Sequence, residues 1–138
     1  MSFTKDTKEL THEGVLAMLA AAVQKAEELD QPQCIVIVDQ SGELLGELRM
    51  TGAKFLSRKS ALSKALTAAS IGANSENIPP EVRPLIGLAT GGAVTGLGGG
   101  CPIMFDGYRL GGIGVGSGSP AQDIEVAQAA LKAVGAEV

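Results

Sequence analysis

The order of hydrophobic and polar positions divides the chain into seven elements. Apolar residues that recur every three or four positions predict helices, and apolar, β-branched runs broken by glycine turns predict pairs of strands. The expected elements in order are a helix over 11–29, strands over 34–39 and 43–50, a helix over 53–71, two strands within 101–116 and a helix over 119–134.

Short signals mark where these elements begin and end. Thr11 is a candidate N-cap for the first helix, and Gly72 is a candidate left-handed residue after the second. Residues 40–42 (Gln-Ser-Gly) predict the turn of the first hairpin, and Asp106-Gly107 suits the type I′ turn of the second. Because hairpins join antiparallel strands, we expect an α+β fold with helices packed on an antiparallel sheet.

Residues 73–100 interrupt this pattern. The segment contains three prolines, Pro79, Pro80 and Pro84, followed by many glycines, and its hydrophobic residues show no regular spacing. We therefore expect a loop with one short helical turn. Six glycines fall within 90–103. Such conformational freedom suits a segment that closes over a small ligand or approaches a neighbouring subunit, with disorder as the alternative.

Composition limits both the core and the partners. The 138 residues suit one domain, 1–138, but only 3% are aromatic, so burial in a homo-oligomer is expected to supplement a thin core. A net charge of −4 excludes general nucleic-acid binding, and no membrane span or signal peptide appears, so we expect a cytoplasmic protein. Cys34 and Cys101 are expected as buried free thiols, with a disulfide or metal pair as the alternative.

The stretch GGIGVGSGSPAQD raises the question of nucleotide binding. Gly116, Gly118 and Ala121 match the G-x-G-x-x-A dinucleotide fingerprint, but only a helix and a tail follow, where that fold needs a strand and an acidic residue. What remains is a capping box from Ser119 to Gln122 at a glycine-lined helix N-terminus, which suits a carboxylate or another small anion. Close packing of strand against helix is the other use for such glycines.

Three blocks carry a resemblance to a known family. They are VIVDQSGELLGELRMTGA (36–53), SALSKALTAA (60–69) and GGGCPIMFDGYRLGGIGVGSGSPAQDIEVAQAAL (98–131). In this order they resemble the GlcG/HbpS family, which includes the haem-degrading or haem-binding domain at the C-terminus of PduO-type corrinoid adenosyltransferases. The resemblance implies a profilin-like α/β/α sandwich around a five-stranded antiparallel sheet, with the fifth strand from 88–96. It also implies oligomers, and a tetrapyrrole or small-carboxylate ligand.

Lys64 is the first candidate for chemistry. It stacks with Ser60 and Thr67 at helical spacing, which gives a polar stripe that faces either a pocket or solvent. In a pocket the amine would serve as a base, a Schiff-base nucleophile or an anion anchor. Asp123 either interacts favourably with the dipole of the last helix or contacts Lys64 or Arg49. Lys64 with Asp123 is the expected acid–base pair.

Arg49 and the glycine turns complete the candidate ligand site. The guanidinium of an arginine at the end of a strand can bind a carboxylate through two hydrogen bonds. The alternative is an ordinary surface arginine, which is the more common finding. The family pattern has Asp where Thr51 stands, which argues against a role that needs an acid beside Arg49. The expected ligand-binding positions are Gly98, Gly99 and Gly100, as oxyanion donors, and Gly116, Ser117 and Gly118.

His12 is the only histidine, and it is the candidate metal ligand. The resemblance implies a haem iron ligand near the start of the domain, whereas an exposed polar residue is the ordinary finding there; Met50, Met104 or Tyr108 could also ligate. Few aromatic residues are available to stack on a porphyrin, and a single histidine argues against structural zinc.

The residues therefore favour a small-ligand-binding protein whose ligand is a tetrapyrrole or a small carboxylate. The alternative is a lyase, isomerase or tautomerase of a small oxo- or hydroxy-acid, with Lys64 as base or nucleophile and Arg49 as the carboxylate anchor. A purely structural oligomer is the third hypothesis. No cofactor other than haem is expected.

Overall fold

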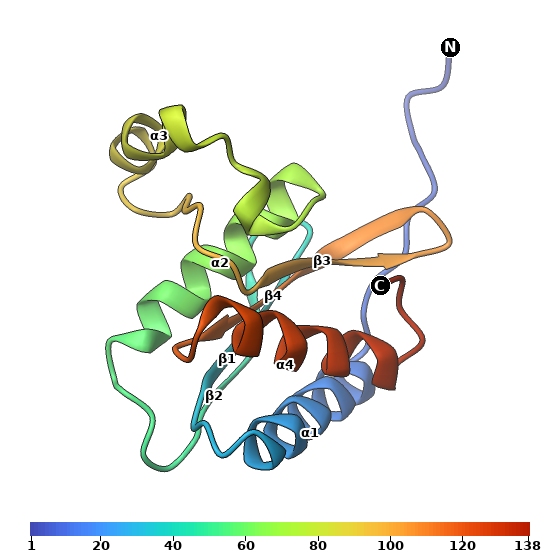
Figure 1. The fold of residues 1–138 in the computed structure, drawn as a ribbon. Helices are drawn as coiled ribbons and strands as arrows, with labels where there is room; N and C mark the ends of the chain where they lie inside the picture. Colours follow the sequence, from blue (N-terminus) through green and yellow to red (C-terminus); the bar gives the residue numbers. More distant parts are fainter.

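The computed structural model describes residues 1–138 and places three helices against one antiparallel sheet, with a fourth, short helix away from it (Figure 1). In chain order the elements are α1 (His12–Glu28), β1 (Cys34–Asp39), β2 (Leu44–Arg49), α2 (Ser57–Ile71), the 3₁₀ turns η1 (Ser75–Asn77) and η2 (Pro80–Val82), α3 (Arg83–Ala89), β3 (Gly100–Phe105), β4 (Tyr108–Gly116) and α4 (Pro120–Ala133). All seven predicted elements are present, and the start of α2 shifts most, from 53 to 57. None of the helices is long and apolar enough to cross a membrane.

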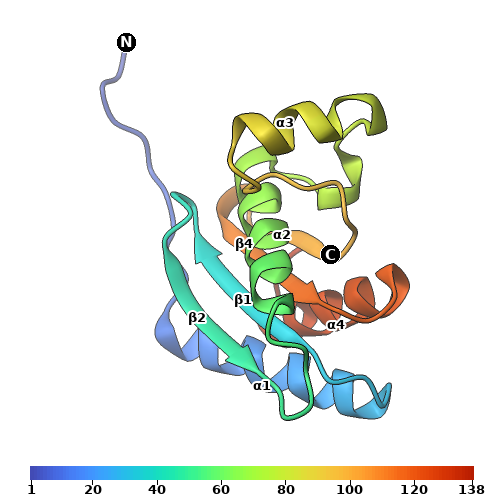
Figure 2. The same ribbon diagram turned by 90° about the vertical axis from the view of Figure 1, so that its left-hand side faces the viewer.

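The four strands form a sheet in the order β2-β1-β4-β3, with every neighbouring pair antiparallel. Helices α1 and α4 cover one face of this sheet, and α2 lies on the other (Figures 1 and 2). The core accordingly has two parts. A larger cluster, including Met18, Ile35 and Ile113, lies beneath α1 and α4, and a smaller one, including Val36 and Ala65, lies beneath α2.

The sheet has four strands, so the prediction of a fifth from residues 88–96 was wrong. Leu88 and Ala89 end helix α3, and the chain then turns at Gly91 and Gly92, whose φ angles are +62° and +86°. This left-handed backbone is not the extended conformation that a strand needs. Hydrogen bonds tie the following residues to α2, not to the edge of the sheet.

Residues 73–100 contain more helix than predicted. The prediction treated each proline only as a residue that interrupts a helix. The segment holds two 3₁₀ turns and the seven-residue helix α3. Pro80 and Pro84 occupy the first turns of η2 and α3, where a missing N–H breaks no helical hydrogen bond.

Predicted caps and turns are confirmed. The Thr11 hydroxyl accepts from the Gly14 N–H, and Gly72 closes α2 in the left-handed conformation. Asp106 and Gly107 have φ angles of +50° and +80°, which the type I′ turn requires at both central positions. These local signals set the ends of elements that tertiary contacts then pack together.

Helix α2 lies directly on the backbone of β4. A Cβ on Gly114 would collide with the carbonyl oxygen of Ala61, and one on Gly112 with that of Ala65. The facing side chains of α2 are themselves alanines, and Ala61, Ala65 and Ala69 are almost wholly buried. Glycine opposite alanine therefore lets helix and strand approach more closely than larger side chains would allow.

The two cysteines are free and buried, as predicted, and they lie in different core clusters on opposite faces of the sheet. Their positions exclude the alternative of a disulfide. Burial raises the pKa of both thiols, and together with the charge of Glu76 it raises that of Cys101 to about 12. Both cysteines therefore act as small apolar core residues.

We predict that Gly114→Ala lowers the free energy of unfolding by about 2–3 kcal/mol, because the new methyl group overlaps the α2 backbone. Urea unfolding followed by circular dichroism measures the change. Gly87→Ala is the matched control, because the added Cβ meets only an ordinary contact, 3.7 Å from the Val94 carbonyl oxygen. Equal stability of the two variants would contradict the direct contact between α2 and β4.

We also predict that iodoacetamide fails to alkylate Cys101 in the folded protein at neutral or mildly alkaline pH. A pKa of about 12 leaves almost no thiolate there, and the side chain is buried. Mass spectrometry should find the label only after urea is added. Rapid alkylation of the native protein would contradict the burial of this thiol.

Candidate functional site

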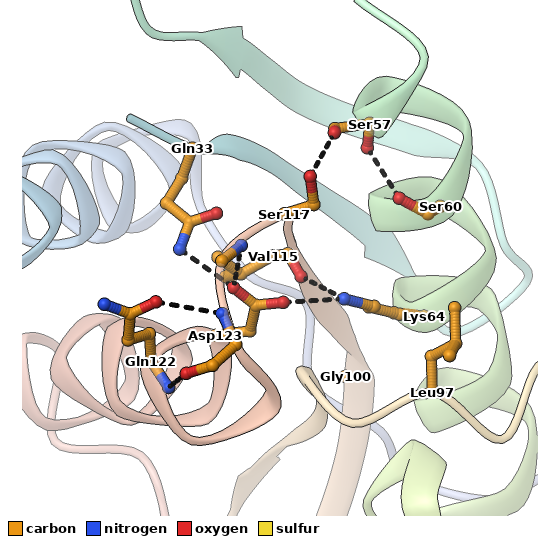
Figure 3. A network of polar contacts seen from close by, with 12 residues as sticks. Gln33, Ser57, Ser60, Lys64, Leu97, Gly100, Val115, Ser117, Gln122 and Asp123 are labelled. Carbon is orange, nitrogen blue, oxygen red and sulfur yellow. Dashed lines mark hydrogen bonds and ion pairs between the residues drawn. The ribbon is translucent and has the colours of Figure 1, made fainter. Parts of the chain in front are cut away.

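Lys64 and Asp123, which the sequence analysis expected as an acid–base pair, form a buried ion pair. The Lys64 Nζ donates to Asp123 Oδ2 at 2.9 Å and to the Val115 carbonyl oxygen at 2.8 Å (Figure 3). The two side chains are only 4% and 2% exposed. Since α2 and α4 lie on opposite faces, this pair links the two helical layers past the end of β4.

The second oxygen of Asp123 is also fully engaged. Oδ1 accepts from the Gln33 Nε2 at 2.8 Å (Figure 3). It also accepts from the Gly118 N–H at 2.8 Å. The Gly118 N–H, in the glycine turn before α4, therefore binds a carboxylate, but that carboxylate belongs to Asp123 of the same chain and not to a ligand. Ser119 and Gln122 form the predicted capping box beside it.

Gln33 is a site residue that the sequence analysis missed. Its side chain is completely buried, and its Oε1 has no hydrogen-bond partner. The one signal in the sequence is a polar residue directly before the buried strand β1, and such a residue is common at strand ends. Only the tertiary structure brings Gln33 to Asp123, 90 positions away.

Two glycines leave the space that the ion pair occupies. A Cβ on Gly99 would lie 2.8 Å from the Asp123 Cβ and 3.2 Å from the Lys64 Nζ. Gly116 faces the Ser60 hydroxyl and the Lys64 Nζ, at 3.0 and 3.6 Å from its hypothetical Cβ. The Gly100 N–H, predicted as an oxyanion donor, donates instead to the Ser75 hydroxyl at 3.0 Å.

The hydroxyl groups beside Lys64 bond to the chain itself. Ser60 donates to the Ser57 carbonyl oxygen, and the hydroxyls of Ser57 and Ser117 lie 2.6 Å apart (Figure 3). Thr67 is buried, and its hydroxyl accepts from the Thr95 N–H at 3.0 Å. The predicted polar stripe on α2 thus faces inward, where it holds neighbouring segments.

This arrangement supports a structural ion pair more directly than a reactive amine. Two of the three Lys64 N–H groups are bonded within the chain, and neither Lys64 nor Asp123 lines any of the four main surface hollows. A base or nucleophile must reach its substrate, and the buried Lys64 side chain exposes little surface to one.

Arg49 lies apart from the ion pair. It is exposed at the end of β2, and its Nε donates to the Ala53 carbonyl oxygen at 3.1 Å. The hollow that it lines, about 660 Å³, also contains Glu27 and Asp30 from the end of α1. Acidic neighbours reduce the attraction of this hollow for a carboxylate. The structure therefore does not bring Arg49, Lys64 and Asp123 into one site.

His12 lies at a third place, on the first turn of α1. Its side chain is 88% exposed, and Nε2 lies 2.8 Å from the Glu13 carboxylate. It lines an open hollow of about 470 Å³ together with Leu10, Val15 and Leu45. No group of three or more histidine, cysteine or acidic side chains is arranged to hold a metal ion.

Comparison with known proteins agrees with this fold. The family model described as "Haem degrading protein HbpS-like" matches residues 10–132. The chain belongs to this HbpS-like family. It is similar to the corrinoid adenosyltransferase PduO of Citrobacter freundii, with 37% identity over 119 residues, which are 83% of this chain and 36% of PduO. The chain thus spans about a third of the PduO relatives that it matches.

Solved structures of HbpS-like proteins superpose along nearly the whole chain. The Klebsiella pneumoniae protein ORFY has a TM-score of 0.92 and 29% identity, with 100% of this chain and 99% of ORFY covered. The PduOC:heme complex has a TM-score of 0.88 and 30% identity, with 94% and 98% covered. These likenesses confirm the family expected from the sequence and its antiparallel α+β fold.

We predict that Lys64→Met lowers the free energy of unfolding by about 3–5 kcal/mol, because it leaves the Asp123 carboxylate buried without its cation. Replacing both residues, by Lys64→Met with Asp123→Leu, should cost less than the sum of the two single changes. Urea unfolding of the single and double variants measures this coupling.

Lys132→Met, on the exposed surface of α4, is the control and should change stability by no more than about 0.5 kcal/mol. If Lys64→Met costs no more than this control, the ion pair does not anchor α2 to α4.

Proposed function

We propose that this protein binds haem or a related tetrapyrrole, with His12 as an axial ligand of the iron. The observation that carries the proposal is the exposed His12 imidazole beside an open hollow, which is lined by Leu10, Val15 and Leu45 and also by the polar residues Glu9, Thr11 and Glu13. The family description names haem degradation, and the PduOC:heme complex, 30% identical, shows that a protein of this fold takes haem. Bound haem would supply a redox-active iron.

The residues around His12 fit a ligand held at the surface. The only charged partner of the imidazole is Glu13. An exposed ion pair contributes only about 0–1 kcal/mol to stability, so iron can displace the Glu13 carboxylate from the imidazole. Leu16, one helical turn after His12, is 64% exposed, and Leu45 is 37% exposed. These side chains offer the flat porphyrin ring apolar contact, whereas the hollow itself is too open to enclose it.

The structure gives less support to a small carboxylate as the ligand. The helix N-terminus that would receive it already binds the carboxylate of Asp123, and Arg49 lies beside acidic residues. The buried, ion-paired amine of Lys64 gives no support to the lyase, isomerase or tautomerase hypothesis. The tetrapyrrole is therefore the ligand that we propose.

We further propose that the protein acts in the cytoplasm as a homo-oligomer. Two buried free thiols suit a reducing compartment. Large apolar side chains stay exposed in the single chain, among them Phe55, Leu85 and Leu88. Burial between copies would remove these side chains from water.

The test of haem binding is a titration of the purified protein with haemin, followed by the Soret band. Wild type should show saturable binding, and His12→Ala should lose the ligated band because it removes the nitrogen that coordinates iron. Gln24→Ala, an exposed change in the middle of α1, is the control and should leave the band unchanged. Binding that does not saturate, or that His12→Ala leaves unchanged, would reject His12 as the ligand.

A further inference from the structure

The largest of the four main surface hollows takes no part in the site described above. Its volume is about 880 Å³, which is in the range of small-molecule sites. It lies at the start of β4, at the other end of that strand from the Lys64–Asp123 pair. Residues from five segments line it, namely 5–7, 40–42, the last turns of α2, 90–94 and 107–109. Figure 2 shows the end of α2, the turn after β1 and the loop after α3 at one end of the molecule.

Arg109 contributes a free hydrogen-bonding edge to this lining. Its Nη1 donates to the carbonyl oxygens of Ala69 and Ser70, at 3.2 and 2.7 Å, and so caps the end of α2. Nε and Nη2 form the edge that binds an oxyanion through two parallel hydrogen bonds, and they donate to no acceptor in the chain. No carboxylate lies within ion-pair distance of this guanidinium. One nitrogen therefore fixes the group, and the other two remain for a ligand.

The charges at the hollow favour an anion. Two cations, Lys5 and Arg109, and one carboxylate, Asp6, line it, so their net charge is +1, whereas that of the whole chain is −4. Lys5 has no carboxylate within ion-pair distance. The two nearest acids outside the lining are engaged elsewhere. Asp39 accepts from two N–H groups of its own turn, and Asp106 pairs with a lysine of the N-terminal segment.

Hydroxyl groups and an apolar wall complete the lining. The hydroxyls of Ser41 and Ser70 are hydrogen-bonded to no group of the chain, so both are free to donate. Leu66, Ala93 and Val94 supply apolar surface in the same hollow. An anion that carries a small apolar group would make use of both kinds of lining.

We propose that this hollow binds a phosphate monoester with a small apolar group, with the free edge of Arg109 on the phosphate. The donors belong to separate segments, since Arg109 lies on β4, Ser41 in the turn after β1 and Ser70 at the end of α2. A phosphate offers three acceptor oxygens in a tetrahedral arrangement, whereas a carboxylate offers two in one plane. Donors from several sides therefore suit the phosphate better. The apolar group would lie against the wall formed by α2 and the loop after α3.

This inference is independent of the haem proposal, and its experiment uses the haem-free protein. Phenyl phosphate is titrated into isotopically labelled protein, and the amide signals of Gly42, Ser70 and Ala93 are followed by NMR. We expect these signals to shift and saturate, with a dissociation constant of about 1 mM or lower and at least about threefold weaker binding of benzoate. Benzoate that binds as tightly would overturn the assignment of phosphate. Shifts that do not saturate, or that gather around His12 instead, would overturn the site.

Substitutions test the guanidinium edge. Arg109→Lys keeps the positive charge but loses the pair of nitrogens, so it should raise the dissociation constant of phenyl phosphate at least about tenfold. Arg58→Lys, at an exposed arginine of α2 outside the hollow, is the matched control and should leave the constant unchanged.

Ser70→Ala tests the site without altering Arg109. Alanine favours the helix, so the variant should stay folded, and loss of the hydroxyl donor should raise the same constant about threefold or more. Circular dichroism verifies that each variant is folded. A constant that neither Arg109→Lys nor Ser70→Ala changes would overturn the proposal.

Discussion

Direct contact between the backbone of α2 and the glycines of β4 is the constraint on which the rest of this structure depends. Alanines on the helix meet Gly112 and Gly114 on the strand, so the helix axis lies closer to the sheet than larger side chains would permit. At this distance the Lys64 side chain can pass the end of β4 to the opposite helical layer. Gly112 and Gly114 therefore serve the packing of helix against strand.

The ion pair that this approach allows links the two helical layers through bonds within the chain. Asp123 accepts hydrogen bonds from Lys64, Gln33 and Gly118, and α2 and α4 are thereby joined across the sheet. Charges so fully paired and buried are poorly placed to act on a substrate. The exposed groups lie at the periphery, where His12 and the leucines of α3 are open to solvent.

Much of the fold and one part of the candidate site could be predicted from local patterns. Helical periodicity, the Asp106-Gly107 turn and the Ser119 cap act over a few residues, so the sequence alone reveals them. Contact of Asp123 with Lys64 was predicted only as one of three alternatives, beside contact with the helix dipole or with Arg49. The segment before β3 was not, because Pro80 and Pro84 are compatible with helix starts as well as with loops, and long-range contacts decide between the two.

The sequence by itself determined the helices, the two hairpins, their caps and the membership of the HbpS-like family, because these depend on short-range periodicity and on ordered motifs. Tertiary structure alone decided that the sheet has four strands and that Gln33 joins the ion pair. The tertiary structure also separated Arg49 and His12 from Lys64. Residues that sequence analysis groups as one candidate site can lie on different elements and on different faces of a sheet. Burial, which no local pattern specifies, encloses Lys64 in its ion pair and leaves the His12 side chain exposed.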